Sequence, residues 1–516
     1  MPDLQSLSNN SFLASYFGFI TLNYNNMDLT SGSLMFVVAL LLITTIFIKI
    51  SQGRILILPA CPSPTPPVVS GLALLGLLPM LSKKGLQSTI YDLYTKLGSV
   101  FTISFFGPKL TFLIGPEVSA HFFQGLDSDI SHGNLFEFTV PMFGKETGYG
   151  VDINIRNEQA RFYVDALKPS MLRRHVGPML QEVEEYFAKW GQEGVVDIKQ
   201  ELDQLVMFIA SRCLLGKEVR EKMFDEFFTL FHQIEEGVNL ISFLFPYIPI
   251  PTNRRRNNAR LKMLKVLSEI VRSRKSSNRS EDDTLQRLID SKYRDGRSTT
   301  EAEVTGTIIG LIFAGKHTSS HTSTWTGACL LSDAKFLTAA IEEQRRIISK
   351  YGECIDYNAL SEMVTLHSCI KETLRLHPPA PMLVRKAHKN FSVRTKEGRE
   401  YVIPKGHTVA SPVLVNNIIP YIYKDPEVYD PDRFSIGREE DKAGGKFSYT
   451  SFSAGRHVCT GEAYAYQQIK VIWSNLLRNF ELKLVSPFPK TDWSKFLLEP
   501  HGKVMVSYKR RAILGA

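Results

Sequence analysis

The amino-acid sequence predicts a mostly helical fold with small β-sheets, attached to a membrane by one N-terminal span. Helical periodicity from about Glu158 to Gly237 predicts the helices. Short alternating segments interrupted by glycine and proline predict the sheets. A long uncharged run near the N-terminus predicts the span. Because no internal repeat is visible, we expect a single large domain behind the span.

The predicted membrane anchor covers residues 29–48, after a polar extension of residues 1–28. A helix of this length spans about 30 Å, the apolar thickness of a bilayer. A signal peptide is one alternative, but neither its basic segment nor its small-residue cleavage site is visible. A buried core helix is the other. Lys49 and Arg54 follow the run whereas acidic residues precede it, so the positive-inside tendency places the rest of the chain in the cytosol.

Residues 49–71 contain a dense, non-periodic group of prolines, which predicts a stiff, extended linker. The main domain is expected to cover residues 72–516. Near its start, Val100–Phe106 and Leu110–Ile114 alternate on either side of a glycine and a proline. This arrangement predicts a β-hairpin.

Four later segments complete the expected topology. Ser242–Pro251 is apolar and broken by prolines, and a basic run follows it. Such a segment often lies on a membrane, although a core segment followed by a solvated charge run explains it equally well. Ser276–Thr300 is polar and charged and predicts a surface loop. Tyr401–Val409 predicts a strand–turn–strand unit, and Lys503–Tyr508 predicts a final strand.

Composition narrows the functional classes. The formal net charge of +9 is compatible with nucleic acid, an anionic membrane or an acidic protein partner. No basic repeat, zinc-finger spacing or basic–aromatic pattern is visible, so we expect no nucleic-acid partner. The six cysteines are scattered and form no C-x-x-C pair, which argues against a disulfide framework and a clustered-thiol zinc site.

An apolar run that we expect to be helical carries His317 and His321 four positions apart. Residues with this spacing share one helix face and are able to hold a metal ion together. The spacing is equally compatible with part of a larger site or with chance. A zinc site needs a third ligand, and the sequence has no His-Glu-x-x-His arrangement.

The segment FSAGRHVCTGE, from Phe452 to Glu462, places a cysteine in a glycine-bearing loop before a predicted helix. N–H groups at a helix N-terminus favour negative charge, and the cations Arg456 and His457 are close in sequence. These residues therefore suit Cys459 as an anionic thiolate ligand.

Two further motifs precede this loop. Glu372 and Arg375 are three apart on a predicted helix, and Arg433 follows in the segment Pro-Asp-Arg-Phe. A buried guanidinium needs an acidic partner, and its forked donors can hold two chain segments together. We therefore expect these three residues to form a structural ion-pair network.

These motifs, in this order, resemble those of the cytochromes P-450, which share E-x-x-R, P-x-R-F and a cysteine loop matched here by F-x-x-G-x-H-x-C-x-G. The resemblance implies the cytochrome P-450 fold and haem b, with its iron bound by the Cys459 thiolate. It implies that Phe452, Gly455, Arg456 and His457 help to bind the haem. It also implies a monooxygenase that uses dioxygen and receives NADPH electrons through NADPH–cytochrome P-450 reductase.

The helix with the two histidines resembles the helix that crosses the distal side of the haem in this family. Its pattern A-G-x-H-T-S begins at Ala314. The resemblance implies that Gly315 lets the helix open to make room for dioxygen, and that His317 and Thr318 deliver protons. The resemblance therefore argues against the zinc interpretation of the two histidines. His321 replaces an apolar residue of related enzymes, so a substrate-facing role and an ordinary helix position both remain open.

Longer stretches, from roughly Pro59 to Arg511, are similar to the sterol 14α-demethylases, particularly the plant branch; LFPYIPIP and RLHPPAPMLVRK are examples. This similarity implies a hydrophobic sterol or triterpenoid substrate and a catalytic domain on the cytosolic side of the endoplasmic reticulum membrane. It also implies that Arg385 and His457 bind the haem propionates, because these anions need cationic donors. The alternative is that both are surface cations.

The expected substrate loop, FEFTVPMFGKETGY, departs from that branch. Phe136 replaces a tyrosine and lacks its hydroxyl, whereas Phe138, Phe143 and Tyr149 are kept. The remaining expected substrate contacts are Ala314, His321, Met382 and Leu383. Because an unmatched polar group in an apolar cavity costs a few kcal/mol, the histidine suggests an oxygenated or differently shaped substrate.

Two substrate hypotheses remain for this branch. The first is 14α-demethylation of a plant sterol such as obtusifoliol. The second is hydroxylation or epoxidation of another triterpenoid in specialised metabolism, which the altered substrate loop favours. A third class, a haem protein that rearranges peroxides without a reductase or that binds haem without catalysis, is disfavoured by the intact Thr318.

Overall fold

The computed structural model describes residues 64–511, apart from residues 71, 105–106, 278–280 and 282. The predicted polar extension (1–28), the predicted anchor (29–48) and most of the predicted linker lie outside the described residues. Among the helices that are described, none combines the length and the apolar character needed to cross a membrane.

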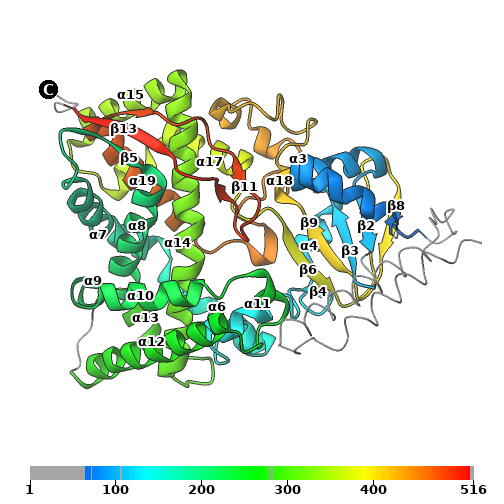
Figure 1. The fold of residues 1–516 in the computed structure, drawn as a ribbon, viewed down its shortest axis with the longest axis horizontal. Coiled ribbons are helices and arrows are strands. Elements are labelled where there is room, and N and C mark those ends of the chain that lie inside the picture. Colours follow the sequence, from blue (N-terminus) through cyan, green and yellow to red (C-terminus); the bar gives the residue numbers. More distant parts are fainter. Residues whose placement is uncertain (1–63, 71, 105–106, 278–280, 282, 512–516) are drawn as a thin grey trace, which may run out of the picture.

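The fold is mostly helical with small sheets, as predicted. Figure 1 shows a helical lobe and a smaller lobe built around a sheet, with helix α14 (Glu301–Ser332) running the height of the helical lobe between its other helices. The helix starts with a capping box, in which the side chains of Thr300 and Glu303 each accept from the other's backbone N–H. At about 1.5 Å per residue, α14 is nearly 50 Å long.

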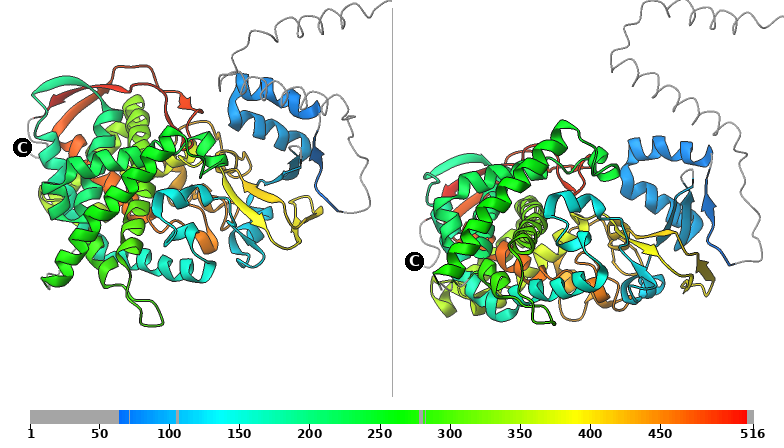
Figure 2. Two further views of the ribbon diagram at one scale, coloured as in Figure 1. Left: turned by 60° about the horizontal axis from the view of Figure 1, so that its bottom comes forward. Right: turned by 90° about the horizontal axis from the view of Figure 1, so that it is seen from below.

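The remaining helices surround α14 or cover the sheet. α8, α12, α17 and α19 pack directly on α14, and Figure 2 shows α12 crossing it steeply. The other helices are α3 (Leu72–Leu97), α4 (Ala120–Gln124), α5 (Val140–Phe143), α6 (Ile153–Ala166), α7 (Pro169–Phe187), α8 (Ile198–Ala210), α9 (Lys217–Lys222), α10 (Phe224–Glu235), α11 (Leu240–Leu244), α12 (Pro251–Ser276), α13 (Thr284–Asp290), α15 (Ala334–Tyr351), α16 (Tyr357–Ser361), α17 (Val364–Leu376), α18 (Val413–Asn416) and α19 (Glu462–Asn479).

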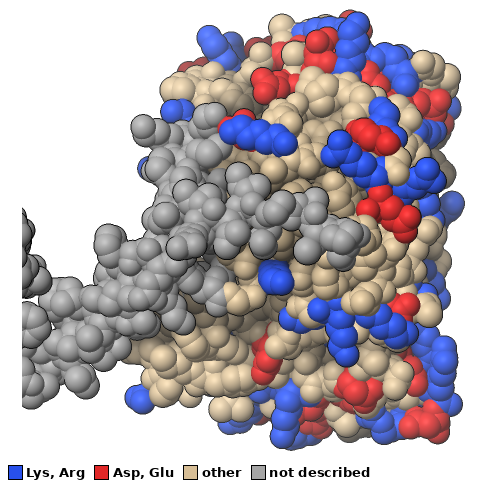
Figure 3. All heavy atoms as spheres, turned by 90° about the vertical axis from the view of Figure 1, so that its right-hand side faces the viewer, with Lys and Arg blue, Asp and Glu red and all other residues tan. Residues whose placement is uncertain are grey.

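A six-stranded sheet, in the order β1-β2-β3-β9-β6-β4, forms the smaller lobe. Its strands are β1 (Val68–Val69), β2 (Val100–Ser104), β3 (Lys109–Leu113), β4 (Ile130–Ser131), β6 (Leu383–Ala387) and β9 (Thr408–Ser411). The hairpin predicted after the linker is present as the antiparallel pair of β2 and β3. On the outer face of this lobe, charged residues of both signs are interspersed, and uncharged residues form much of the middle (Figure 3).

Three smaller sheets complete the described part of the fold, with strand orders β10-β13-β5, β11-β12 and β7-β8. Their strands are β5 (Glu193–Asp197), β7 (Phe391–Arg394), β8 (Glu400–Ile403), β10 (Phe480–Leu484), β11 (Thr491–Asp492), β12 (Glu499–Pro500) and β13 (Met505–Arg510). The predicted final strand is β13. Both strands predicted in Tyr401–Val409 form, but β8 pairs with β7 whereas β9 joins the large sheet.

Two local predictions were wrong. The continuous helical segment predicted after Glu158 is interrupted by β5, which pairs with β13 near the other end of the chain. The surface loop predicted for Ser276–Thr300 contains the short helix α13, whose Leu285 and Leu288 are buried. Asp283 caps this helix by accepting from the N–H of Gln286, and it also pairs with buried Arg274 at 2.9 Å.

The apolar segment Ser242–Pro251 lies on the surface. It comprises the end of α11 and an irregular stretch before α12, and Phe245 and Tyr247 are 61% and 62% exposed. The basic residues that follow belong to α12 rather than to a loop. An exposed apolar segment is inconsistent with a core position, so of the two predicted alternatives the membrane-facing one fits its exposure better.

Candidate functional site

The cysteine loop wraps closely against the sheet lobe. A helical turn, η7 (Gly455–His457), precedes Cys459, whose backbone N–H donates to the carbonyl of Phe452 at 2.9 Å. Gly455 has a φ of +66°, and a Cβ there would lie 2.2 Å from the carbonyl oxygen of Phe123. A larger residue would therefore both strain the backbone and push the loop away from α4.

The Cys459 side chain reaches solvent but is surrounded by protein. Desolvation raises the pKa of its thiol, while the backbone N–H groups of Gly461 and Glu462 lower it. The sequence predicted that Arg456 and His457 would stabilise the thiolate, but the geometry does not show this. Arg456 is exposed, and His457 Nε2 lies 2.9 Å from Asp127 Oδ1. A thiolate at this position therefore depends on the helix N-terminus and on a bound cation.

The network predicted for Glu372, Arg375 and Arg433 is present and completely buried. Arg375 Nε and Nη2 donate to the two carboxylate oxygens of Glu372, each at 2.8 Å, and Arg433 Nε donates to the same carboxylate at 2.8 Å. Arg375 also donates to the carbonyls of Asn417, Pro426 and Val428. Sequence reasoning missed a fourth member, Glu440, which pairs with Arg433 at 2.5 Å. The network joins α17 to the segment before the cysteine loop.

A second group of nitrogen-bearing side chains, Arg385, His132 and His457, gathers where β6 meets the cysteine loop. Arg385 is 3% exposed, contacts His132, and has an Nε atom without a hydrogen-bond partner in the described structure. The rings of His132 and His457 lie 4.9 Å apart. Burial lowers the pKa of Arg385 to about 10, and burial together with Arg385 lowers that of His132 to about 2. Among the described residues, Asp127 is the acid paired with this group.

On α14, the predicted proton-delivery residues lie beside space that protein atoms do not fill. Thr318 Oγ1 donates to the carbonyl of Ala314 at 2.7 Å. Ala314 is exposed, and a Cβ at Gly315 would meet no atom within 4 Å. His317 Nε2 lies 2.7 Å from the carboxylate of Glu235 on α10, which Lys316 also contacts at 3.1 Å. Neither Glu235 nor Lys316 was predicted from the sequence.

His321 continues the same helix face. Its Nε2 lies 3.0 Å from Glu499 of β12, and its ring centre lies 5.7 Å from that of His317. Each histidine therefore has its own carboxylate, and among the described residues no group of three or more ligating side chains could hold a metal ion. The structure thus gives no support to a zinc site.

Both histidine–carboxylate pairs border one cleft of about 550 Å³ between α8, α10, α14 and β12. The cleft is also lined by several charged or titratable side chains, Asp197, Lys199, Asp203, His232 and Lys316. It connects the histidine face of α14 with solvent. Water in such a cleft could exchange protons with these side chains.

The predicted substrate residues fall into three groups. Phe136 stacks on Tyr149 with ring centres 5.1 Å apart, and Phe138 contacts Phe243 and Phe496 at 5.1 and 5.6 Å. Phe143 of α5 packs on Phe313 of α14, next to Ala314, with ring centres 5.6 Å apart. In the sheet lobe, Met382 and Leu383 are half-buried against apolar clusters.

Comparison with known proteins agrees with this geometry. A family model described as Cytochrome P-450 matches residues 66–506. The chain belongs to the cytochrome P-450 family. It is 50% identical to obtusifoliol 14-alpha demethylase of Sorghum bicolor, over 93% of this chain and 97% of the relative, and 54% identical to sterol 14-demethylase of Arabidopsis thaliana, over 83% and 88%. It is 33% identical to lanosterol 14-alpha demethylase of Homo sapiens, over 90% of each chain.

The solved structures support the same fold. A cyanobacterial protein with retinoic acid bound superposes with a TM-score of 0.75 at 21% identity, over 87% of this chain and all of the other. As a member of the cytochrome P-450 family, the chain is a haem-dependent monooxygenase, an oxidoreductase that takes electrons from a redox partner.

The haem that the family implies fits the residues present. The buried guanidinium of Arg385, with its unpaired Nε, needs an anion, and the neighbouring histidines add two further donors beside Asp127. Haem carries two propionates, which would satisfy such a group. His132 is a candidate propionate ligand that the sequence did not reveal, because it lies more than 250 residues from Arg385.

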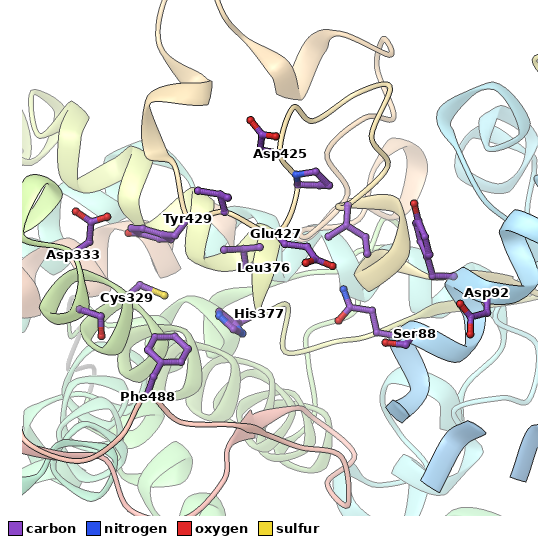
Figure 4. Close-up of a pocket in the computed structure, with 16 residues that line it drawn as sticks. Ser88, Asp92, Cys329, Asp333, Leu376, His377, Asp425, Glu427, Tyr429 and Phe488 are labelled. Carbon is purple, nitrogen blue, oxygen red and sulfur yellow. The ribbon is translucent and has the colours of Figure 1, made fainter. Parts of the chain in front are cut away.

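Another cavity of this cytochrome P-450, of about 1020 Å³, lies away from these residues. Figure 4 shows acidic side chains around it, including Asp92, Asp333, Asp425 and Glu427, with His377 and Phe488 below them. None of the residues predicted to bind iron, haem or substrate lines this cavity. Cavity size therefore does not locate the predicted site, which rests on the cysteine loop and the histidine face of α14.

Proposed function

We propose that this cytochrome P-450 oxidises a sterol and catalyses the 14α-demethylation of a plant sterol such as obtusifoliol. The observation that carries the proposal is the 50–54% identity to plant enzymes with that name, spread over most of the chain. The complete set of proximal and distal residues supports catalysis rather than haem binding alone. The successive oxidation of one methyl group then demands a substrate held in one orientation.

Haem b would be held by three kinds of contact. The Cys459 thiolate would bind the iron, and Arg385, His457 and His132 would bind the propionates. The backbone turn at Gly455, with Phe452 and Arg456 beside it, would shape the surface under the ring. When bound, haem b supplies the activation of dioxygen for insertion into an unactivated C–H bond.

The protein would supply protons and exclude stray water. Thr318, whose hydroxyl donates to the carbonyl of Ala314, would turn its oxygen toward the distal space as an acceptor and relay a proton there, and His317 would transfer a proton at Nε2, which is 2.7 Å from Glu235. Burial raises the pKa of Glu235, but His317 and Lys316 outweigh this effect and hold the pKa below its usual value. Glu235 therefore stays ionised and can receive protons from the cleft and return them to His317.

A second substrate is favoured by one observation at the aromatic rim formed by Phe136, Phe138 and Tyr149. Phe136, which replaces a tyrosine of the demethylases, stacks on Tyr149 and cannot offer a hydroxyl. A chain that keeps the haem residues while changing this rim could hydroxylate or epoxidise another triterpenoid. The two alternatives share the same chemistry and differ in the shape of the substrate.

The membrane is a further proposed partner. The uncharged residues 29–48 would anchor the chain after the polar extension 1–28, and the linker 49–71 would hold the domain 72–516 on the cytosolic face of the endoplasmic reticulum. The exposed apolar segment that includes Phe245 and Tyr247 would rest on the bilayer beside the basic start of α12. Electrons would come from NADPH–cytochrome P-450 reductase.

The experiment that tests the function is turnover with a plant reductase and NADPH. Obtusifoliol and β-amyrin, a pentacyclic triterpene, are offered side by side and the products are read by mass spectrometry. We expect loss of the 14α-methyl group from obtusifoliol. Oxygen added to β-amyrin, with obtusifoliol untouched, would replace the sterol assignment by the triterpenoid one.

A further inference from the structure

The C-terminal hairpin of β11 and β12 reaches from α14 to the aromatic rim of the site. Figure 1 shows this segment passing alongside α14 toward the boundary between the lobes. Phe496, between the two strands, contacts Phe138 of the substrate loop and Phe243 of α11. Leu498 is tied to the segment after α17 by donating its N–H to the carbonyl of Pro379 at 2.8 Å. The position of the hairpin therefore affects three segments around the proposed substrate space.

Glu499 fixes the base of this hairpin. Its carboxylate lies 3.0 Å from His321 Nε2 on α14, 3.2 Å from Lys199 Nζ on α8, and 3.8 Å from Lys495 within the hairpin. Burial raises the pKa of Glu499, but His321 and Lys199 lower it to about 2. The carboxylate is therefore charged at neutral pH, and two cationic or donor groups on separate helices hold it in place.

The environment of His321 indicates that this contact is not incidental. The side chain is 8% exposed, and its Nδ1 atom is buried without a hydrogen-bond partner in the described structure. An apolar side chain at this point would avoid the free-energy cost of that unpaired atom. What the histidine adds in return is its contact with Glu499, the single charged contact that joins α14 to the hairpin in the described residues.

We propose that His321 and Glu499 form a positioning latch that fixes the hairpin at residues 491–500 and thereby sets how tightly, and in which orientation, the substrate is held. The proposal rests on the proposed function in that the rim borders the substrate space. The latch differs from the pair of His317 and Glu235, which lies one turn away on the same helix face but involves no residue of the hairpin. His321 is therefore a positioning residue, and His317 a proton-delivery residue.

Hydrogen–deuterium exchange of residues 491–500 in the full-length holoenzyme tests the latch without any substrate. His321→Leu removes the polar contact, and we expect exchange of the hairpin amides to become about three- to tenfold faster. Glu499→Gln keeps the size but not the charge and should give a smaller acceleration. His321→Gln restores a donor toward Glu499 and should restore slow exchange.

A matched control is available in the same hairpin. His501 and Asp492 form another histidine–carboxylate pair, 3.4 Å apart, but the His501 side chain is 71% exposed and does not contact α14. His501→Gln should leave the exchange of the hairpin unchanged. Equal acceleration by His501→Gln and His321→Leu, or no acceleration by His321→Leu, would overturn the latch.

Steady-state kinetics separate positioning from proton delivery. With whichever of obtusifoliol and β-amyrin is turned over, His321→Leu should raise KM by about tenfold while kcat and the fraction of NADPH used for product stay unchanged. A fall in that fraction with an unchanged KM would instead assign His321 to proton delivery and refute the proposal. If neither compound is turned over, the substrate assignment fails while the exchange experiment still decides on the latch.

Discussion

The buried network around Glu372 and the histidine face of α14 are both built from charged side chains, but they satisfy those charges differently. Arg375 and Arg433 are fully buried and each donates to a carboxylate and to backbone carbonyls. On α14, each histidine meets one carboxylate beside a solvent-connected cleft, and Nδ1 of His321 has no partner in the described structure. A fully satisfied network resists rearrangement, whereas singly paired groups at a cleft can exchange protons or move.

The difference separates two tasks. The network joins α17 to the segment that leads into the cysteine loop, so it forms the structural frame behind the predicted thiolate ligand. The two pairs on α14 connect that helix to α10 through Glu235 and to the β11–β12 hairpin through Glu499, the segments that we propose to act in proton delivery and in substrate positioning. Variants in the first region should therefore affect stability, and variants in the second should affect coupling and binding.

Cys459→Ala should have the largest effect on activity. It would show that the protein still folds when the predicted iron ligand is removed. We expect complete loss of the thiolate absorption signature of the reduced, carbon-monoxide-bound protein, together with loss of turnover. The free energy of unfolding should change little by comparison, because the network around Glu372 does not include the thiol. Cys354→Ala, at an exposed cysteine, is the control and should retain both properties. A retained thiolate signature in Cys459→Ala would refute the ligand assignment.

Arg375→Lys tests the contribution of the buried network around Glu372 to stability. A lysine cannot reproduce the paired donors of the guanidinium, so Glu372 loses a bidentate partner in a fully buried position. We expect the free energy of unfolding to fall by about 3–5 kcal/mol, measured by denaturant titration. Lys335→Gln removes an exposed pair with Asp432, next to Arg433 in sequence, and should cost no more than about 1 kcal/mol. Similar losses for both variants would mean that burial does not set the strength of the network.

The same contrast explains what the sequence could reveal. Glu372 and Arg375 are three residues apart, and Cys459 lies in a compact loop, so local patterns were sufficient to predict them. Glu235, Glu499 and His132 lie far along the chain from their partners, and no periodicity signals such a pairing.

The missed secondary structure has a similar cause. β5 is a short strand whose partner, β13, lies about 300 residues away, so a local window shows only the helical periodicity around it. Helix α13 is short and is surrounded by charged residues, so its buried Leu285 and Leu288 were hidden by the composition of the segment. Local patterns therefore predicted the buried network around Glu372 better than the pairs that the α14 histidines form with Glu235 and Glu499.

Of the three variants, Thr318→Ala should have the smallest overall effect. It should leave the fold intact and selectively lower the coupling of NADPH oxidation to product formation. The change removes the hydroxyl that donates to the carbonyl of Ala314, and alanine favours the helix, so the fold should be retained. We expect the fraction of NADPH electrons recovered in product to fall about tenfold or more, with hydrogen peroxide released instead, because a positioned proton donor is lost. Product and peroxide are measured against NADPH consumed, with Thr318→Ser, which keeps a hydroxyl, as the control. Unchanged coupling in Thr318→Ala would remove Thr318 from the proton path and leave that role to His317 and Glu235.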